Sequence, residues 1–356
     1  MKKRKLLSFF TVTALLATAA LSGCSSSSKP SNSGSTSNSN TKSNKTVTLT
    51  IGGYSTIKDE FEAIFPLFQK EWKKKTGETV EFKESYQGSG AQALNITNGF
   101  EADIAALSLE GDINKIQKAG LITHDWKSAP HAGIITKSIA VFGVRDGNPK
   151  SIKDWSDLTK PGVQVLIPNP KTSGGARWDV NAIYGAGLKI SEEKTGKQDP
   201  AQAKELLTKV YKNVKSLDKS GEESMSTFDK GTGDVIITYE NELLDRIKSG
   251  QKYQEIIPKY TTSIENPAAV VDKYVDKHGT RKVAEAFLNF LWTPEAQKVF
   301  AESGFRSVDS DVAKTYADKF TVPAGLFDTN YLGGWDKVGK TLYNDGGIWD
   351  QVVAGN

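Results

Sequence analysis

Residues 163–178 read VQVLIPNPKTSGGARW and join an apolar strand to the start of a helix through a short loop. The run 163–168 is mainly apolar, as expected for a strand inside an α/β sheet. Residues 172–175, Thr-Ser-Gly-Gly, are typical of a loop that opens a helix. In an open α/β sheet, ligands bind beyond the carboxyl ends of the strands, where such loops lie. This stretch therefore predicts both a fold class and a place for a ligand.

The same succession of strands and helices extends in both directions along the chain. Residues 47–52 alternate as a strand does, and residues 60–75 carry apolar side chains at helical spacing before Gly77. The roughly 310 residues from Thr46 onward suffice for two domains. The pattern predicts an α/β protein with mostly parallel sheets. The other expected strands are 80–83, 102–107, 138–144 and 234–239, and the other expected helices are 201–214, 282–291 and 294–302.

Four loops rich in Ser and Gly follow the expected strands. Glycine lets a backbone approach a ligand closely, and the first N–H groups of a helix have no partner within that helix. Together with the positive end of the helix dipole, these free donors attract anions. A single loop of this kind is also an ordinary helix cap, but four in corresponding places favour an anion site. The loops are 53–56, 87–90, 172–175 and 220–221.

The first 23 residues have the composition of a secretory signal. Residues 2–5 are all basic, and Leu6–Leu21 is an apolar stretch interrupted only by Ser and Thr. The stretch is too short, and too rich in Ala and Thr, for a convincing membrane span. We therefore expect residues 1–23 to direct export and to be removed.

Cys24 is the single cysteine of the chain, so it has no cysteine partner for an internal disulfide. The sequence Leu21-Ser22-Gly23-Cys24 resembles the bacterial lipobox, which implies acylation of this thiol and cleavage just before it. Stable anchoring needs more than one acyl chain, a requirement that the implied diacylglyceryl group meets. We therefore expect a protein anchored by lipid at Cys24 to the outer face of the cell membrane, or otherwise periplasmic.

Residues 24–46 read as the lipidated cysteine followed by a flexible tether, because Ser, Asn, Lys, Thr, Gly and Pro dominate from Ser25 to about Lys45. Such a tether reaches ~25 Å. Removing residues 1–23 takes away four basic residues and no acidic ones, so the formal net charge of +4 falls to 0. A mature chain without net charge argues against a nucleic-acid-binding protein.

Residues 169–178 also resemble the signature of bacterial sulfate- and thiosulfate-binding proteins of ABC transporters. The resemblance extends from about Val47 to Val353, nearly the whole mature chain. It is carried in addition by the segments 72–77, 88–90, 98–103, 144–150, 155–158, 233–235, 240–242 and 333–335.

The resemblance implies a two-lobed periplasmic-binding-protein fold of type II. Each lobe is then a mixed, mostly parallel sheet flanked by helices, with the ligand cleft between the lobes. We expect lobe 1 to begin with residues 47–137, lobe 2 to comprise residues 138–262, and residues 263–356 to return to lobe 1 and end in helices. The implied partners are sulfate and the permease subunits of an ABC importer, and a monomer without a cofactor is expected.

The resemblance also implies that hydrogen bonds alone hold the anion. The hydroxyl of Ser173 is one implied donor. Tyr239 stands where the family has an indole donor, and Ser55 stands where the family commonly has an aspartate. The phenol of Tyr239 donates one hydrogen bond but also accepts, so selectivity could differ. The full implied set is the Ser173 hydroxyl, the backbone N–H groups of Ser55, Ser89, Gly174, Gly175 and Gly221, and the side chain of Tyr239.

A site made only of donors suits sulfate, which offers only acceptors at neutral pH. Hydrogen phosphate carries an O–H, and a buried donor without an acceptor costs about 1–3 kcal/mol. A carboxylate at the site would favour phosphate, and none of the implied ligands is acidic. Glu240 and Glu242 are close to Tyr239 in sequence, so phosphate remains an alternative with thiosulfate, molybdate and tungstate.

Two other classes of function stay open as alternatives, a sensory lipoprotein and an exported hydrolase. His124, His131 and His278 show neither metal-ligand spacing nor a nucleophile motif, so we expect surface or capping roles and a protein that is not an enzyme. Arg177 could steer an anion, but bracing of the helix is the favoured reading. The aromatic residues Tyr331, Trp335, Tyr343 and Trp349 could form a partner surface, although packing within a lobe is favoured.

Overall fold

The computed structural model describes residues 45–355. The expected signal peptide, Cys24 and nearly all of the tether lie outside the described residues. Among residues 45–355, no helix has both the length and the apolar character that crossing a membrane requires.

The described residues contain a ten-stranded sheet whose two halves share one connectivity. In each half, the first strand lies between the second and third and runs parallel to both. An antiparallel strand from a distant part of the chain then completes each half. The sheet order is β2-β1-β3-β9-β4-β7-β5-β6, and β10 and β8 pair with β9 and β4. The strands are β1 Thr46–Tyr54, β2 Thr79–Gln87, β3 Ile104–Ala106, β4 Ile134–Arg145, β5 Val165–Pro168, β6 Val214–Asp218, β7 Val235–Tyr239, β8 Tyr253–Ile256, β9 Tyr260–Val270 and β10 Gly325–Phe327.

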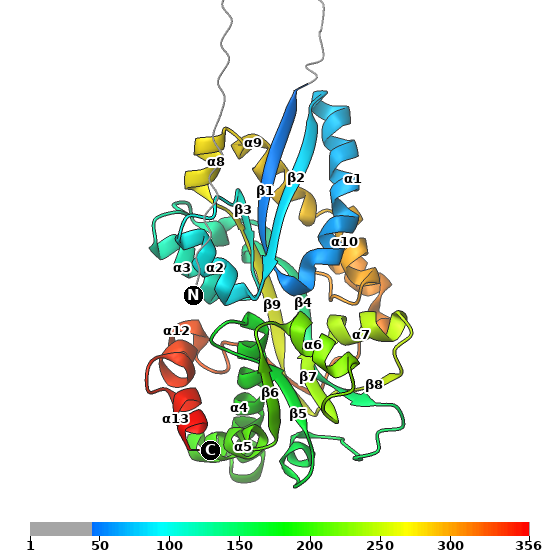
Figure 1. Cartoon of the computed structure of the whole chain (residues 1–356), viewed down its shortest axis with the longest axis vertical. Helices are drawn as coiled ribbons and strands as arrows, with labels where there is room; N and C mark the ends of the chain where they lie inside the picture. Colours follow the sequence, from blue (N-terminus) through cyan, green and yellow to red (C-terminus); the bar gives the residue numbers. More distant parts are fainter. Residues whose placement is uncertain (1–44, 356) are drawn as a thin grey trace, which may run out of the picture. The chain divides into compact units, whose positions relative to one another are not determined.

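The two long strands β4 and β9 belong to both halves. Residues 134–139 of β4 pair with residues 263–267 of β9, and residues 140–144 of β4 then pair with β7. Residues 268–270 of β9 pair with β3. In Figure 1, both strands run from one group of elements to the other. The halves are therefore joined by backbone that is hydrogen-bonded within the sheet.

Helices cover each half of the sheet (Figure 1). We call lobe 1 the strands β1–β3 with the helices α1–α3 and α8–α10, and lobe 2 the strands β5–β8 with the helices α4–α7, α12 and α13. This grouping follows the packing of helices on strands and on one another. The helices are α1 Lys58–Thr76, α2 Ser89–Thr97, α3 Glu110–Lys118, α4 Gly174–Thr195, α5 Pro200–Tyr211, α6 Gly221–Asp229, α7 Glu240–Lys248, α8 Asp272–His278, α9 Arg281–Leu291, α10 Pro294–Glu302, α11 Ser310–Thr315, α12 Gly334–Val338 and α13 Ile348–Ala354.

The carboxyl-terminal aromatic residues pack on lobe 2. The ring of Trp335 lies edge-on against the buried Trp178 of α4, with 4.9 Å between ring centroids. Trp349 packs in the same way on Tyr211 of α5 at 5.3 Å. The hydroxyl of Tyr343 donates to the carbonyl oxygen of Arg177 at 2.7 Å. These contacts agree with the expected packing role of the aromatic residues.

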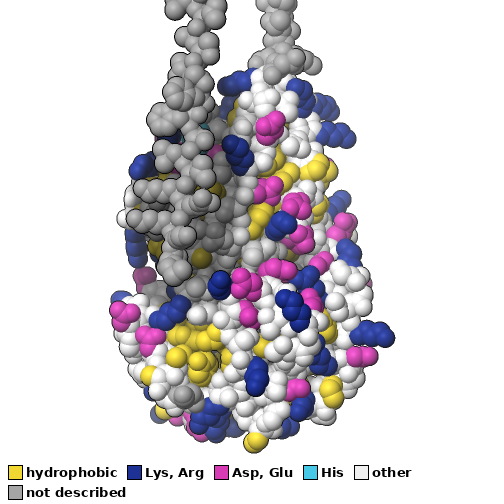
Figure 2. Space-filling model, in the orientation of Figure 1, with side chains coloured by type: hydrophobic (Ala, Val, Ile, Leu, Met, Phe, Trp, Pro, Cys, Tyr) yellow, Lys and Arg dark blue, Asp and Glu magenta, His cyan; other side chains and the backbone are white. Residues whose placement is uncertain are grey.

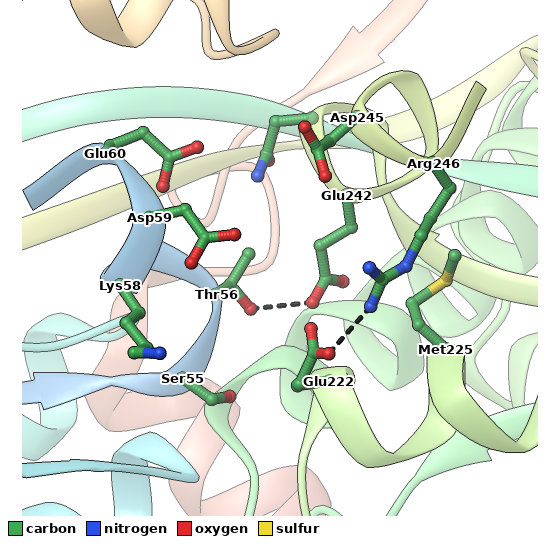
Figure 3. Close-up of a pocket in the computed structure, with 11 residues that line it drawn as sticks. Ser55, Thr56, Lys58, Asp59, Glu60, Glu222, Met225, Glu242, Asp245 and Arg246 are labelled. Carbon is green, nitrogen blue, oxygen red and sulfur yellow. Dashed lines mark hydrogen bonds and ion pairs between the residues drawn. The ribbon is translucent and has the colours of Figure 1, made fainter. Parts of the chain in front are cut away.

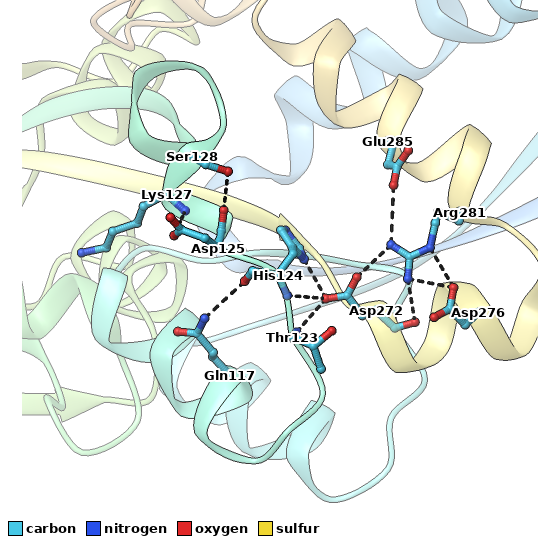
Figure 4. Close-up of polar contacts among 10 residues, drawn as sticks. All are labelled: Gln117, Thr123, His124, Asp125, Lys127, Ser128, Asp272, Asp276, Arg281 and Glu285. Atoms are coloured by element: carbon cyan, nitrogen blue, oxygen red, sulfur yellow. Dashed lines mark hydrogen bonds and ion pairs between the residues drawn. The ribbon is translucent and has the colours of Figure 1, made fainter.

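Two of the histidines, His124 and His278, bind carboxylates inside lobe 1. His124 Nδ1 lies 2.7 Å from Asp272 Oδ2, and Arg281 donates to the other oxygen of Asp272 at 2.8 Å (Figure 4). Burial alone would raise the pKa of Asp272, but the hydrogen bonds from Thr123, His124 and Arg281 outweigh it and hold the pKa far below the usual range. The group ties the loop before β4 to the start of α8.

The surface of the described residues carries mixed charge. Figure 2 shows basic and acidic side chains interspersed over the visible face of both lobes. The visible face is therefore neither predominantly basic nor predominantly acidic.

Phe287 of α9 is the centre of an aromatic cluster in lobe 1. Its ring centroid lies 5.1 Å from those of Phe68 and Phe82, 5.6 Å from that of Phe65 and 5.8 Å from that of Phe61. The side chain is fully buried. The apolar face of α1 thus packs against α9 and β2 around Phe287.

We expect Phe287→Ala to lower the free energy of unfolding by about 3–5 kcal/mol, because it removes a buried ring and leaves a cavity. Urea unfolding followed by circular dichroism measures this. Leu94→Ala is the control, since Leu94 is 58% exposed, and it should change the free energy by less than about 0.5 kcal/mol. Equal effects of the two substitutions would contradict the assignment of this core.

Candidate functional site

The starts of five helical segments meet between the lobes. The parallel strands β1 and β2 of lobe 1 lead into the short helix η1, Ser55–Ile57, and into α2. The strands β5, β6 and β7 of lobe 2 lead into α4, α6 and α7. Each helix therefore begins at the carboxyl end of its strand, which is where open α/β sheets bind ligands. All four Ser/Gly loops singled out in the sequence open one of these segments.

A small cavity lies at this meeting point. The space open to the centre of a water molecule is about 10 Å³, so only a small ligand fits. Both lobes contribute to the lining, since its residues come from η1 and α2 as well as from α4, α6 and α7. The lining residues are Tyr54, Ser55, Thr56, Gly88, Ser89, Ser108, Pro168, Ser173, Gly175, Asp179, Gly221, Ser224, Ile237, Thr238, Tyr239 and Glu242.

The structure brings the residues predicted from sequence together. Of the seven predicted site residues, only Gly174 is absent from the cavity lining in the described part of the chain. It lies next to the cavity, where the two lobes are in contact. The six that line the cavity are Ser55, Ser89, Ser173, Gly175, Gly221 and Tyr239.

Ser173 caps α4 and keeps a hydrogen to donate. Its Oγ accepts from the backbone N–H of Ala176 at 3.3 Å. This bond satisfies the third N–H of the helix, while the N–H groups of Gly174 and Gly175 have no partner within the helix. Because the hydroxyl acts as an acceptor in the cap, its own O–H is available to a ligand. The side chain is buried, with 3% of the residue exposed.

The hydroxyl of Ser89 is already used inside lobe 1. It donates to Asp112 Oδ2 at 2.7 Å and accepts from the backbone N–H of Ser108 at 3.0 Å. The residue can therefore offer a ligand only its backbone N–H, at the first position of α2. This matches the backbone role that the resemblance implies for Ser89.

The absence of a side chain at Gly174 allows the lobes to meet. A Cβ at this position would lie 1.9 Å from Oγ of Ser108 and 2.9 Å from Cβ of Ser89, both in lobe 1. Beside it, Trp178 Nε1 donates to the carbonyl oxygen of Ser108 at 2.7 Å, across the lobes. Glycine is thus required at position 174 because lobe 1 packs too closely there for a side chain.

Tyr239 is buried at the start of α7, and its hydroxyl has no hydrogen-bond partner among the described residues. The same holds within residues 45–355 for the hydroxyl groups of Tyr54 and Ser108, which also line the cavity. Burial raises the pKa of Tyr239 well above the ordinary value for tyrosine, so the phenol keeps its proton. Three residues that line the cavity thus carry a hydroxyl group without a hydrogen-bond partner in residues 45–355, as expected around a polar ligand.

The cavity lining contains no Lys, Arg or His among the described residues. Arg177 does not line the cavity and donates from Nε to the carbonyl oxygen of Pro170 at 3.0 Å, so it ties the start of α4 to the loop before it. This contact agrees with the bracing role favoured from sequence. Any attraction for an anion must therefore come from N–H and O–H groups and from the helix dipoles.

Two buried carboxyl groups line the cavity, those of Glu242 and Asp179. The sequence analysis noted Glu242 as close to Tyr239, but it did not anticipate Asp179. Glu242 Oε1 accepts from the hydroxyl of Thr56 at 2.7 Å, which joins α7 to lobe 1. Burial raises the pKa of Glu242, and the hydrogen bonds from Thr238 and Thr56 oppose this rise. Asp179 lies one helical turn after Gly175, a spacing that would have placed it on the same face. Tyr54 and Ser108 were also missed. Tyr54 belongs to the loop 53–56 but was not singled out as a ligand, and Ser108 stands outside the four Ser/Gly loops.

A family model described as bacterial extracellular solute-binding protein matches residues 49–306. The chain belongs to this family. A sulfate-binding protein of Synechococcus elongatus is 46% identical to this solute-binding protein over 314 residues, which cover 87% of this chain and 88% of that protein. A thiosulfate-binding protein of Pseudomonas aeruginosa is 34% identical over 352 residues, which cover 98% and 99% of the two chains.

A solved structure agrees with these matches. The sulfate-binding protein of Mycobacterium tuberculosis superimposes with a TM-score of 0.76 at 35% identity and covers 84% of this solute-binding protein and 100% of that chain. The predicted α/β fold of two lobes, type II among periplasmic binding proteins, is confirmed. So is the family resemblance drawn from residues 169–178.

The solute-binding protein has a second, larger pocket beside the first. It shares Ser55, Thr56 and Glu242 with the cavity and measures about 170 Å³. Figure 3 shows acidic side chains from α1 facing others from α6 and α7, with Arg246 paired to Glu222. Within residues 45–355, no group of three or more His, Cys, Asp or Glu side chains could hold a metal ion. The residues that line this second pocket are Ser55, Thr56, Lys58, Asp59, Glu60, Glu222, Met225, Asn241, Glu242, Asp245 and Arg246.

Glu60 is the most buried acid on the lobe 1 side of this second pocket, with 6% of the residue exposed. Burial, helped by the negative charges of Asp59, Asp245 and Glu242, raises the pKa of Glu60 from 4.5 to about 8. The folded chain therefore holds this proton at pH values at which the unfolded chain has released it. The contribution of protonated Glu60 to the free energy of unfolding therefore falls as the pH rises from the pKa of Glu60 in the unfolded chain to its pKa in the folded chain.

We expect the free energy of unfolding of the wild type to fall by on the order of 3 kcal/mol between about pH 5 and about pH 8.5 as the proton on Glu60 loses its stabilising effect. Glu60→Gln should remove this fall. Urea unfolding of the wild type and of the variant at both pH values measures the difference. Glu62→Gln makes the same charge change on the same helix at a side chain that is 52% exposed, and it should leave the pH dependence unchanged. A Glu60→Gln variant with the pH dependence of the wild type would contradict this assignment.

Proposed function

We propose that this protein is the sulfate-binding component of an ABC importer. It captures sulfate outside the cytoplasm and delivers it to the permease. The observation that carries the proposal is the small cavity formed by helix starts of both lobes, without a cationic side chain among the described lining residues. The names of the relatives support sulfate as the ligand.

In this proposal the ligand is held by hydrogen bonds from both lobes. Lobe 1 supplies the backbone N–H groups of Ser55 and Ser89. Lobe 2 supplies those of Gly174, Gly175 and Gly221, the hydroxyl of Ser173 and the phenol of Tyr239. The amino-terminal ends of the helices add a favourable potential for an anion.

The expected affinity follows from the number of donors. Charge-assisted hydrogen bonds contribute about 1.5–3 kcal/mol each before desolvation and ordering are subtracted. Roughly five to seven such bonds make a micromolar or tighter Kd reasonable, since micromolar binding corresponds to about −8 kcal/mol. No catalytic step is needed, and we propose that the protein binds its ligand without transforming it.

Closure of the lobes is the proposed signal to the permease. Only the closed form brings the donors of both lobes to one ion, so sulfate shifts the lobes towards closure. We further propose that Cys24 carries the lipid, that the segment after it tethers the body to the membrane, and that the protein acts as a monomer. Nucleic acid has no part in this role.

Thiosulfate is the second candidate ligand. A thiosulfate-binding relative covers nearly the whole chain at 34% identity. Thiosulfate is also a tetrahedral dianion with only acceptors at neutral pH, and the same donors would hold it. The ranking of the two ions is therefore the first property to measure.

We expect Ser173→Ala to weaken sulfate binding at least about tenfold, because it removes one hydrogen bond to a charged ligand. Tyr239→Phe should weaken sulfate binding less, since Tyr239 replaces the indole donor of the family and its contact with the ion rests on less support. Isothermal titration calorimetry at neutral pH with sulfate, thiosulfate, molybdate and phosphate measures this. Thr293→Ala removes a similar helix cap far from the cavity, at the start of α10, and is the control.

Tight sulfate binding that Thr293→Ala preserves and Ser173→Ala weakens would support both the ligand and the site. Heat from another oxyanion in place of sulfate would overturn the ligand and keep the site. No heat from any of the four ions would contradict the proposed function.

We expect Gly174→Ala to hold the lobes apart, because the new Cβ would meet Ser108 Oγ at 1.9 Å. Small-angle X-ray scattering with and without saturating sulfate should show compaction of the wild type and little or none of the variant. Gly111→Ala is the control, because a Cβ at Gly111 would have no neighbour within 4 Å. Normal compaction of Gly174→Ala would show that closure does not depend on this contact.

A further inference from the structure

Asp179 places a carboxyl group in the cavity without a protein partner for one of its oxygens. The residue lies on α4, lines the cavity and is 1% exposed. Its Oδ1 has no hydrogen-bond partner among the described residues. A buried carboxyl oxygen without a partner is costly, so it points to a group that the ligand or a proton supplies.

The titratable groups around Asp179 do not neutralise it. Tyr54, Tyr239 and Glu242 share the cavity with it, and Tyr343 is near both Asp179 and Arg177. Burial, followed by the negative charge of Glu242, raises the pKa of Asp179 well above the ordinary value. Arg177 is engaged by the carbonyl oxygen of Pro170 and does not line the cavity.

A dianion beside this carboxylate would create a strong repulsion. Two like charges in a small site do not both stay ionised, and one proton between them removes the conflict and adds a hydrogen bond. With sulfate, which carries no proton at neutral pH, the proton must come from solvent and reside on the carboxyl group. With hydrogen phosphate, the ion brings the proton, and an ionised carboxylate accepts its O–H.

We propose that Asp179 is a specificity-determining residue through which the cavity binds a tetrahedral oxyanion together with one proton. This rests on the proposed function of the cavity as an oxyanion site. With the lobes open, the carboxyl group faces solvent and is ionised at neutral pH. Closure over sulfate takes up one proton, which Asp179 donates to a sulfate oxygen. Closure over hydrogen phosphate takes up none.

Proton uptake gives a direct readout. Calorimetric titrations at about pH 8 in buffers of different ionisation enthalpy measure the number of protons taken up for each ion bound. We expect about one proton for sulfate and about none for hydrogen phosphate. The association constant for sulfate should fall about tenfold for each pH unit between about pH 7 and pH 9. Asp179→Asn should bind sulfate without proton uptake and without this fall.

The control is Glu255→Gln, which removes a half-buried acid outside the cavity whose pKa is raised to about 7 by partial burial. It should keep the uptake of the wild type. Sulfate binding by the wild type without proton uptake, or uptake that survives in Asp179→Asn, overturns the role of Asp179 and leaves the proposed function intact. No binding of any oxyanion by the wild type between pH 6 and pH 9 overturns the proposed function instead.

Discussion

The site depends on the unpaired N–H groups at the starts of helices that belong to different lobes. Each helix must leave its first donors without a partner of its own, and burying them without an acceptor is unfavourable. Ser173 and Ser220 satisfy one N–H each through their side chains, and the cavity collects the ones that remain. A closed form of the two lobes is thus favourable chiefly when an acceptor sits between them.

The rest of the fold serves this meeting point. The paired strands β4 and β9 join the lobes within the sheet, which limits the ways in which they can move. Close contacts then determine how near the lobes come, with Gly174 against Ser108 and the hydrogen bond from Thr56 to Glu242. Because no cationic side chain lines the cavity among the described residues, selectivity must arise from donors, acceptors and protons.

Much of this could be predicted from the sequence. The strand, loop and helix pattern around residues 163–178 predicted the α/β fold, and the Ser/Gly loops predicted which helix starts converge. The strand β9 was not predicted, and its sequence is interrupted by Asn266 and Pro267, which are uncommon inside strands. Asp179 and Ser108 were missed for a different reason. Their importance comes from burial without a partner, a property of tertiary packing that local motifs do not encode.

The most direct test of the oxyanion site is a crystal structure of residues 45–356 grown with selenate, which has the shape of sulfate and a strong anomalous signal. We predict one anomalous peak in the cavity, with oxygen atoms within hydrogen-bond distance of the backbone N–H groups of Gly174 and Gly175 and of Oγ of Ser173. A peak elsewhere on the protein, or a closed cavity without the ion, would contradict the assignment of this cavity as the binding site.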